Sequence, residues 1–302
     1  MSASGKILVG TCSWTDKTLI ESGLFYPTGV TTPEERLRFY ASQFPIVEVD
    51  ATYYAPPSEQ NARLWVARTP ADFTFDVKAF SLLTGHATEA RLLPAPLQAL
   101  LAPETKAKRR LYMKDLPVEI LERVWELHRR ALAPLEEAGK LGVILFQFPP
   151  WFSKNRANVA HLETVARELP RYRIAVEFRG GAWMEPEHQA GTLAILEALG
   201  FSYVCVDEPQ LARLSTPAVV AATADIALVR FHGRNSEMWA ARTATAAERF
   251  RYLYSEDELR EWVPRIRQLA QGAAEVHALM NNCYRDQGVV NAAQLASLLE
   301  LE

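Results

Sequence analysis

Eight short apolar runs recur along this chain, and longer segments with helical character separate most of them. Runs of this length are typical of strands that are buried on both faces. They lie at Ile7–Gly10, Ile46–Val49, Phe73–Val77, Val143–Phe148, Arg173–Phe178, Ser202–Val206, Ala227–Phe231 and Glu275–Met280. Strands that alternate with helices form a parallel sheet, and eight of them in 302 residues favour an α/β fold, the closed (β/α)8 TIM barrel.

The helical segments strengthen this interpretation. Thr32-Pro33-Glu34-Glu35 and Ser255-Glu256-Asp257-Glu258 each place a capping side chain before an acidic first turn. The predicted helices span 33–44, 58–68, 116–135, 155–169, 189–199, 256–270 and 291–299. Between the sixth and seventh strands we expect at most an abbreviated helix. The alternative, an open doubly wound sheet, lacks support because no Gly-x-Gly-x-x-Gly turn follows the first strand.

The span between the third and fourth predicted strands is too long for one crossover. It contains five prolines and the basic run Lys106-Ala-Lys-Arg-Arg110. We interpret residues 87–115 as an inserted loop over the barrel mouth, followed by a long helix, within a single domain of residues 1–302. This insertion is either a solvated surface excursion or a substrate lid.

Composition narrows the classes of protein. The 33 Lys and Arg residues nearly balance the 36 Asp and Glu residues, so binding to a bulk polyanion is not supported. Three cysteines without Cys-x-x-Cys spacing favour a reducing compartment. No stretch of the chain is long and apolar enough to predict a membrane span, and the first residues lack the pattern of a cleavable signal. We therefore expect a cytoplasmic protein.

Polar residues of a single parity end six of the eight predicted strands. In a TIM barrel the chemistry lies at the C-terminal ends of the strands, and alternation decides which side chains face inward. The inward positions are Glu48 and Asp50, Asp76 and Lys78, Gln147, Glu177 and Arg179, Cys205 and Asp207, and Arg230 and His232, with either Asn281 or Asn282 on the last strand. Because an unpaired buried charge is costly, this pattern predicts a charge-dense mouth.

The first functional hypothesis is an enzyme, a hydrolase or isomerase that acts by acid–base chemistry on a small polar substrate, anionic or sugar-like. Its candidate catalytic residues are Glu48, Glu177, Asp207 and His232. Its candidate substrate-binding residues are Trp14, Asp50, Tyr53, Lys78, Gln147, Arg179, Arg230, Asn281 and Asn282. No nucleotide cofactor is expected, because the sequence lacks a nucleotide-binding fingerprint.

Three other interpretations use the same residues. In a metal-dependent phosphoesterase or nuclease, Glu48, Glu177, Asp207 and His232 would ligate a divalent ion, and the basic run at 106–110 would contact a nucleic-acid backbone. The absence of His-x-His and His-Glu-x-x-His motifs argues against it. In a non-catalytic barrel the mouth would recognise a metabolite or a protein. Finally, pairs such as Glu48 with Arg230 would serve structure alone.

Short motifs follow one another over nearly the whole chain. They include Gly10-Thr11-Cys-Ser-Trp14, Val47-Glu48-Val49-Asp50 with Tyr53-Tyr54, Trp65-x-x-Arg68-Thr69-Pro70, Phe146-Gln147-Phe148-Pro149-Pro150, Val176-Glu177-Phe178-Arg179, Arg230-x-His232-Gly233-Arg234 and Asn281-Asn282. This order resembles domain-of-unknown-function family 72, the YecE-like proteins. The resemblance implies a TIM-barrel fold and no established reaction. Asp50 stands where the family usually has asparagine, and Thr84-Gly85-His86 is one residue longer than the usual Thr-His.

Overall fold

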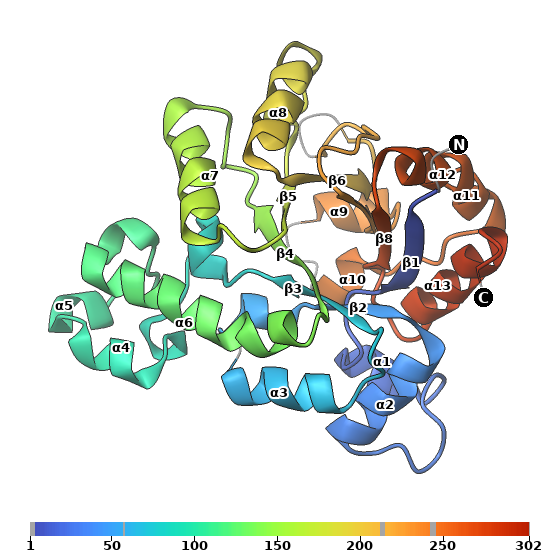
Figure 1. Ribbon diagram of the computed structural model, residues 1–302, viewed down its shortest axis with the longest axis horizontal. Helices are drawn as coiled ribbons and strands as arrows, with labels where there is room; N and C mark the ends of the chain where they lie inside the picture. The colour runs from blue at the N-terminus through green and yellow to red at the C-terminus, as the bar shows by residue number, and fades with distance from the viewer. Residues whose placement is uncertain (1–3, 57, 212–214, 242–245, 302) are drawn as a thin grey trace.

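Eight parallel strands close into a barrel in the computed structural model, which describes residues 4–56, 58–211, 215–241 and 246–301 (Figure 1). The strands are β1 (Lys6–Thr11), β2 (Ile46–Val49), β3 (Thr74–Lys78), β4 (Leu141–Phe148), β5 (Ile174–Phe178), β6 (Ser202–Asp207), β7 (Ile226–Phe231) and β8 (Glu275–Met280). Each strand pairs with the next along the chain, and β8 pairs with β1 to close the barrel. All eight predicted strands are confirmed, with boundaries within two residues of the expected ones.

Helices surround the barrel (Figure 1). They are α1 (Lys17–Ser22), α2 (Pro33–Gln43), α3 (Glu59–Ala67), α6 (Val118–Glu137), α7 (Arg156–Glu168), α8 (Pro186–Leu199), α9 (Ser236–Ala240), α10 (Ala246–Arg249), α11 (Glu256–Arg260), α12 (Val263–Gly272) and α13 (Gln287–Leu298). The predicted capping boxes are present at Thr32 and Ser255. The single helix expected at 256–270 is wrong, because α11 and α12 are separate. Pro264 cannot donate the hydrogen bond that would continue α11.

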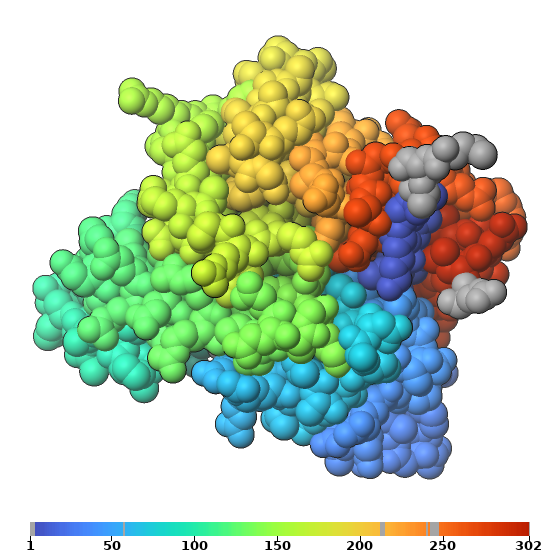
Figure 2. All heavy atoms as spheres, in the orientation of Figure 1, coloured from blue at the N-terminus to red at the C-terminus, as the bar shows by residue number. Residues whose placement is uncertain are grey.

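Residues 87–115 form a lobe of short helices rather than an open loop. The lobe contains η3 (Ala90–Leu92), α4 (Ala95–Leu100), α5 (Pro103–Lys106) and η4 (Met113–Asp115), and a bridge between Thr88 and Leu111 joins its two ends. Leu93, Leu97 and Leu101 are buried, and α4 contacts α6. The lobe projects at the left edge of Figures 1 and 2. Its role as a substrate lid stays a prediction.

The interior of the barrel contains two polar groups, and apolar side chains of β4–β7 separate them on one side of the barrel. Near the base, at the N-terminal ends of the strands, Asp76 accepts hydrogen bonds from His277 and from the backbone N–H of Val143. A second polar group lies at the mouth. An apolar cluster, separate from the main core between sheet and helices, fills much of the space between: Val143, Leu145, Ala175, Val204, Val206, Ile226 and Leu228. Within the described ranges, no helix is both long and apolar enough to cross a membrane.

Candidate functional site at the barrel mouth

A network of buried charges crosses the barrel mouth, and Arg230 lies at its centre. Arg230 donates Nε and Nη2 to the two carboxylate oxygens of Glu48, at 2.9 and 2.7 Å, and Nη1 to Glu177. All three side chains are completely buried. Burial raises the pKa of Glu48, although the neighbouring guanidinium opposes this shift. Because Arg230 is paired on both sides, the free-energy cost of burying its charge is offset.

Glu177 is the most heavily hydrogen-bonded carboxylate of the network. Besides Arg230, its Oε1 accepts from Gln147 Nε2 at 2.6 Å and from Arg179 Nη1 at 3.2 Å, and it lies 3.1 Å from His232 Nε2. Burial acts to raise the pKa of Glu177, but Arg230, His232 and Arg179 hold it well below its usual range. Glu177 is therefore a fixed anion that orients four neighbouring side chains.

His232 connects this anion to the last strand. Its Nδ1 lies 2.8 Å from Asn281 Nδ2, and its Nε2 faces Glu177. An amide nitrogen can only donate, so Nδ1 is the acceptor and Nε2–H donates to Glu177. Burial lowers the pKa of His232 to about 3 despite the nearby carboxylate. The imidazole is therefore neutral at pH 7.

Stacked rings support the outer faces of the two strands that carry Gln147 and Glu177. Phe148 and Phe152 stack with centroids 4.0 Å apart, and Phe178 and Trp183 stack at 4.5 Å. Because side chains alternate along a strand, Phe148 on β4 points outward beside the inward Gln147, and Phe178 on β5 points outward beside the inward Glu177. Such packing restricts the ends of both strands and so fixes the polar side chains.

A cavity of about 450 Å³ lies above the network. Its lining includes Asp50, Tyr53, Tyr54, Lys78, Gln147, Arg179, Phe250, Asn281 and the two cysteines Cys12 and Cys283, with no residue from the lobe. Lys78 Nζ lies 2.7 Å from Asp50 Oδ1 and 4.9 Å from the centroid of the Tyr53 ring. Burial alone would lower the pKa of Lys78, but Asp50 raises it. Arg179 lies over the Trp239 ring at 4.8 Å. Asp16 and Lys17 also line the cavity, which thus presents three cations and two carboxylates.

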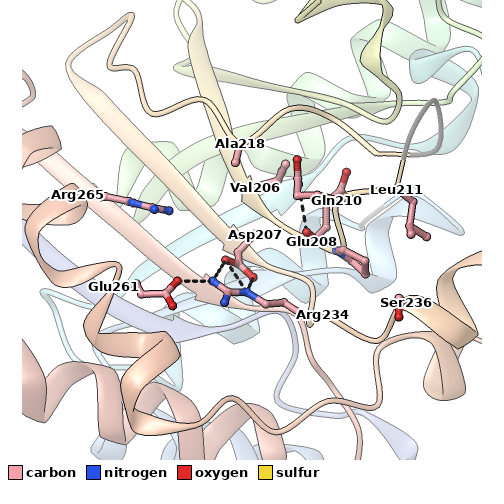
Figure 3. Close-up of a pocket in the computed structure, with 11 residues that line it drawn as sticks. Val206, Asp207, Glu208, Gln210, Leu211, Ala218, Arg234, Ser236, Glu261 and Arg265 are labelled. Atoms are coloured by element: carbon pink, nitrogen blue, oxygen red, sulfur yellow. Dashed lines mark hydrogen bonds and ion pairs between the residues drawn. The ribbon is translucent and has the colours of Figure 1, made fainter.

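Asp207 does not reach the mouth, so the predicted orientation of the sixth strand is wrong. Its carboxylate accepts from Tyr254 Oη at 2.7 Å and from Trp262 Nε1 at 2.6 Å, both on the outer side of the barrel. It also accepts from Arg234 Nη2 at 2.7 Å (Figure 3). Cys205 likewise packs in the core outside the barrel, whereas the interior cluster includes the valines on either side of it. Both faces of β6 are buried and largely apolar, so the alternation of residues along this strand did not indicate which side chains face inward.

Glu208 is the acidic residue that the sequence interpretation missed. It lies one position beyond Asp207, on the inward parity, and is 4% exposed. Its Oε2 accepts from Arg179 at 3.2 Å and its Oε1 from the Thr216 N–H at 2.7 Å. Burial raises the pKa of Glu208 to about 7, even though Arg179 opposes the shift. The only sequence signal for it was a second acidic residue beside the expected one.

Two predicted substrate-binding residues also lie elsewhere. Trp14 packs edge-on against Trp65 and Phe75, at 6.0 and 6.5 Å, in the core outside the barrel. Asn282 donates to Asn291 Oδ1 at 2.8 Å and so joins the end of β8 to α13. Asn281 is therefore the inward asparagine. The predicted residues that the structure does bring together are Glu48, Asp50, Tyr53, Lys78, Gln147, Glu177, Arg179, Arg230, His232 and Asn281.

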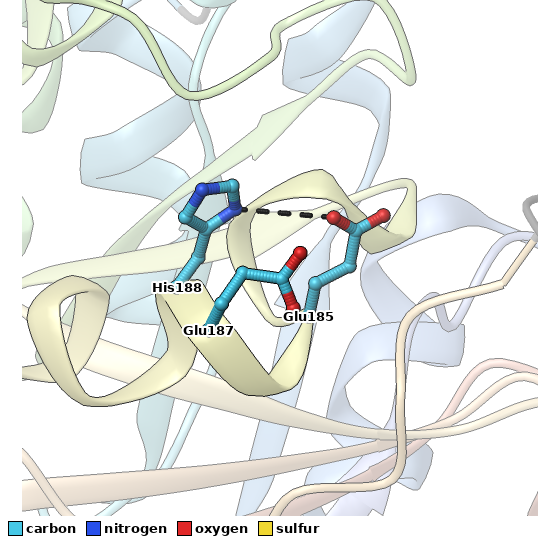
Figure 4. Close-up of side chains that lie close together, drawn as sticks. All are labelled: Glu185, Glu187 and His188. Carbon is cyan, nitrogen blue, oxygen red and sulfur yellow. Dashed lines mark ion pairs between the residues drawn. The ribbon is translucent and has the colours of Figure 1, made fainter.

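The four residues suggested as ligands of a divalent metal ion do not converge. Asp207 faces outward, and the guanidinium of Arg230 lies between Glu48 and Glu177. Among the described residues, the group of three potential ligands whose atoms all lie within 4.8 Å of one another is Glu185, Glu187 and His188 at the start of α8 (Figure 4). Those carboxylates are exposed, as acidic groups commonly are without a metal. The group shares no residue with the lining of the mouth cavity.

A family model, described as protein of unknown function DUF72, matches residues 8–302. The chain belongs to the DUF72 family. The UPF0759 protein YunF of Bacillus subtilis (strain 168) is 32% identical over 300 residues, which cover 98% of this chain and 95% of YunF. This confirms the family that the motifs predicted.

Solved structures of DUF72 proteins share the whole barrel. A DUF72 protein from Thermotoga maritima MSB8 is 32% identical with a TM-score of 0.76, over 98% of this chain and 99% of that one. A DUF72 protein from Enterococcus faecalis V583 is 27% identical with a TM-score of 0.80, over 98% and 96%. These similarities confirm the TIM-barrel fold.

Proposed function

We propose that this protein is an enzyme, a hydrolase or isomerase that acts on a small anionic substrate in the mouth cavity by acid–base chemistry. One observation carries the proposal: Lys78 and Arg179 line the same cavity as Asp50. This cavity lies at the C-terminal end of the barrel, where TIM-barrel enzymes have their active sites. Lys78 and Arg179, in a cavity of about 450 Å³, suit a phosphate or carboxylate group.

Asp50 is the carboxylate best placed to move a proton. Its Oδ1 lies 2.7 Å from Lys78, while among the described residues its Oδ2 has no hydrogen-bond partner, and 34% of the side chain is exposed. We assign Asp50 as the general base and Lys78 as its proton-donating partner. The sequence candidates Glu48, Glu177 and His232 are buried and hydrogen-bonded. We therefore assign them a positioning role. The side chains that they hold in place include Arg179, Gln147 and Asn281.

Anion binding is tested with inorganic phosphate, glycerol 3-phosphate and acetate in a thermal-shift assay. A ligand at 100 times its dissociation constant adds about 2.7 kcal/mol to the free energy of unfolding, which raises the Tm by several degrees. The rise is expected to disappear in Arg179→Met and to persist in Arg167→Met, a matched change of an arginine that is 67% exposed on α7. A Tm that responds to none of the anions contradicts the proposal.

Turnover separates an enzyme from a binding barrel. Hydrolysis of p-nitrophenyl phosphate and isomerisation of sugar phosphates are followed with the wild type and with Asp50→Asn. The variant is expected to lose turnover, because an amide cannot accept the proton. It should keep or increase its phosphate affinity, because it also removes the negative charge beside Lys78. Binding without any turnover supports a non-catalytic metabolite-binding barrel, and turnover that requires added Mn²⁺ or Zn²⁺ supports the metal-dependent reading. Contact with nucleic acid and a cytoplasmic location stay predictions.

A further inference from the structure

Four aromatic side chains form a continuous series of ring contacts beside the mouth cavity. The ring of Tyr53 contacts Tyr54 at 5.1 Å and His86 at 5.3 Å between centroids, and His86 in turn contacts Trp151 at 5.7 Å. All three contacts are edge-to-face, with interplanar angles of 71–88°. In such contacts one ring of each pair offers only its edge, so ring faces remain open for another partner.

These rings come from three different loops. Tyr53 and Tyr54 follow β2, His86 follows β3 and Trp151 follows β4. Both tyrosines line the mouth cavity. The structure fixes the His86 ring through a contact of 2.8 Å between its Nδ1 and Thr84 Oγ1. His86 also lies close enough to two of the cavity cations to respond to them: burial lowers its pKa to about 4, and Lys78 and Arg179 add to the shift.

The outermost rings are strongly exposed. Trp151 is 65% exposed and Tyr54 is 59% exposed. A large apolar side chain held open beside a polar cavity is typical of a surface that binds a ligand. An aromatic face accepts either a planar ring or the C–H face of a sugar, whereas Lys78 and Arg179 attract an anion.

We propose that Tyr54, His86 and Trp151 form a ledge that receives the ring of a phosphomonoester of a ring-bearing alcohol. The phosphate group of this substrate binds to Lys78 and Arg179. This inference rests on the proposed function and names its substrate class. The ring is a pyranose or a planar aromatic ring, since both offer a flat face. The neutral imidazole of His86 adds a hydrogen-bonding group at the edge of the ledge, because Nδ1 alone is engaged by Thr84.

Isothermal titration of the wild type with four probes tests the ledge: inorganic phosphate, glycerol 3-phosphate, glucose 6-phosphate and phenyl phosphate. At least one ring-bearing probe is expected to bind about tenfold tighter than acyclic glycerol 3-phosphate, the gain expected from one aromatic contact. The tighter of the two ring-bearing probes then identifies the kind of ring.

Trp151→Ala is expected to abolish this ring preference while leaving the affinity for inorganic phosphate unchanged. Because the side chain is mostly exposed, the variant retains the fold, and Tyr54→Ala gives a second, independent reading. The matched control is Leu100→Ala, a change of a side chain that is 55% exposed on α4. If the phosphates bind but neither ring increases affinity, or if Trp151→Ala keeps the preference, the ledge is refuted. If no phosphate binds, or binding ignores Arg179→Met, the proposed function fails instead.

Discussion

Two histidines are completely buried in the barrel interior, one near each end, and each contacts a carboxylate. At the mouth, His232 Nε2 lies 3.1 Å from Glu177 Oε1, and at the base His277 Nδ1 lies 2.9 Å from Asp76 Oδ2. Burial alone lowers the pKa of both. At His232 burial prevails and the pKa falls to about 3, whereas at His277 the carboxylate prevails and raises the pKa to about 9.

The difference lies in the neighbours of each carboxylate. Glu177 is already paired with Arg230 and Arg179, and both guanidinium groups also repel a proton on His232. At the base, the charged groups that act on His277 are Asp76 and, at 3.3 Å, the carboxylate of Glu275. A histidine beside a carboxylate is therefore neutral or charged according to whether a cation has already compensated that carboxylate.

Removal of Arg230 has the largest expected effect. Arg230→Met leaves the buried carboxylates of Glu48 and Glu177 without their shared cation, and we expect it to lower the free energy of unfolding by about 3–5 kcal/mol. Urea denaturation measures this loss, with the exposed Arg167→Met as control. The double variant Glu48→Gln/Arg230→Met should recover part of it. A loss below about 1 kcal/mol for Arg230→Met would show that the mouth network is dispensable for stability.

The base histidine makes stability depend on pH above neutrality. The folded pKa of His277, about 9, exceeds its ordinary value of 6.5, so its contribution is fully present below pH 6.5 and is lost as pH rises through 9. We expect the advantage of the wild type over His277→Gln to shrink by up to about 3 kcal/mol between pH 6 and pH 10. Urea denaturation at the two pH values measures it, and a constant difference would contradict a charged His277.

The mouth histidine is expected to respond with the opposite sign. Its folded pKa of about 3 lies below 6.5, so the stabilisation is present above pH 6.5 and is lost as pH falls towards 3. Histidine NMR titration of the wild type should show His232 still neutral at pH 5 while His277 is already protonated at pH 7. The variants His232→Gln and His277→Gln assign the two NMR signals. Similar titration midpoints for the two histidines would contradict the difference between the two ends of the barrel.

A smaller loss of stability is expected from a substitution that crowds only the polar group at the base. A Cβ atom on Gly142 would lie 2.2 Å from Asp76 Oδ1, so Gly142→Ala must displace the carboxylate that holds His277 and the Val143 N–H. We expect a loss of about 1–3 kcal/mol, typical of overpacking. Phosphate binding at the mouth should be unchanged, which titration calorimetry checks. Altered binding would mean that the two ends communicate.

The smallest expected effect tests the role of the cations at the mouth. Arg179→Met removes a positive charge that acts against protonation of His232, so we expect the pKa of His232 to rise. Stability should fall less than in Arg230→Met, because Arg230 still pairs with Glu177 and only Glu208 loses its cation. NMR titration of the imidazole measures the shift. If the pKa of His232 is the same in Arg179→Met and in the wild type, Arg179 does not contribute to lowering it.

Most of the fold was accessible from the sequence because each strand is a compact apolar run, and eight such runs leave few topologies. The mouth was predicted well at Glu48, Lys78, Gln147, Glu177 and Arg230, each of which stands between apolar neighbours. Asp76 has the same pattern but lies near the base. The prediction failed at Asp207, whose partners Arg234, Tyr254 and Trp262 are 27, 47 and 55 residues away. No local pattern reveals that an outward carboxylate is satisfied by distant donors.

Apolar side chains separate the two polar groups on only part of the barrel wall. On β8, Leu279 separates His277 from Asn281, and on β4, Leu145 separates Val143 from Gln147. Four residues along a strand span about 13 Å, and side chains that far apart usually contribute independently to stability. On the other side of the barrel the two groups meet, because Asp76 on β3 is in register with Glu48 on β2 and lies two residues from Lys78. A change of ligand at the mouth is therefore least constrained on the β4 and β8 side, whereas on β2 and β3 any new ligand must remain compatible with the base that holds the fold.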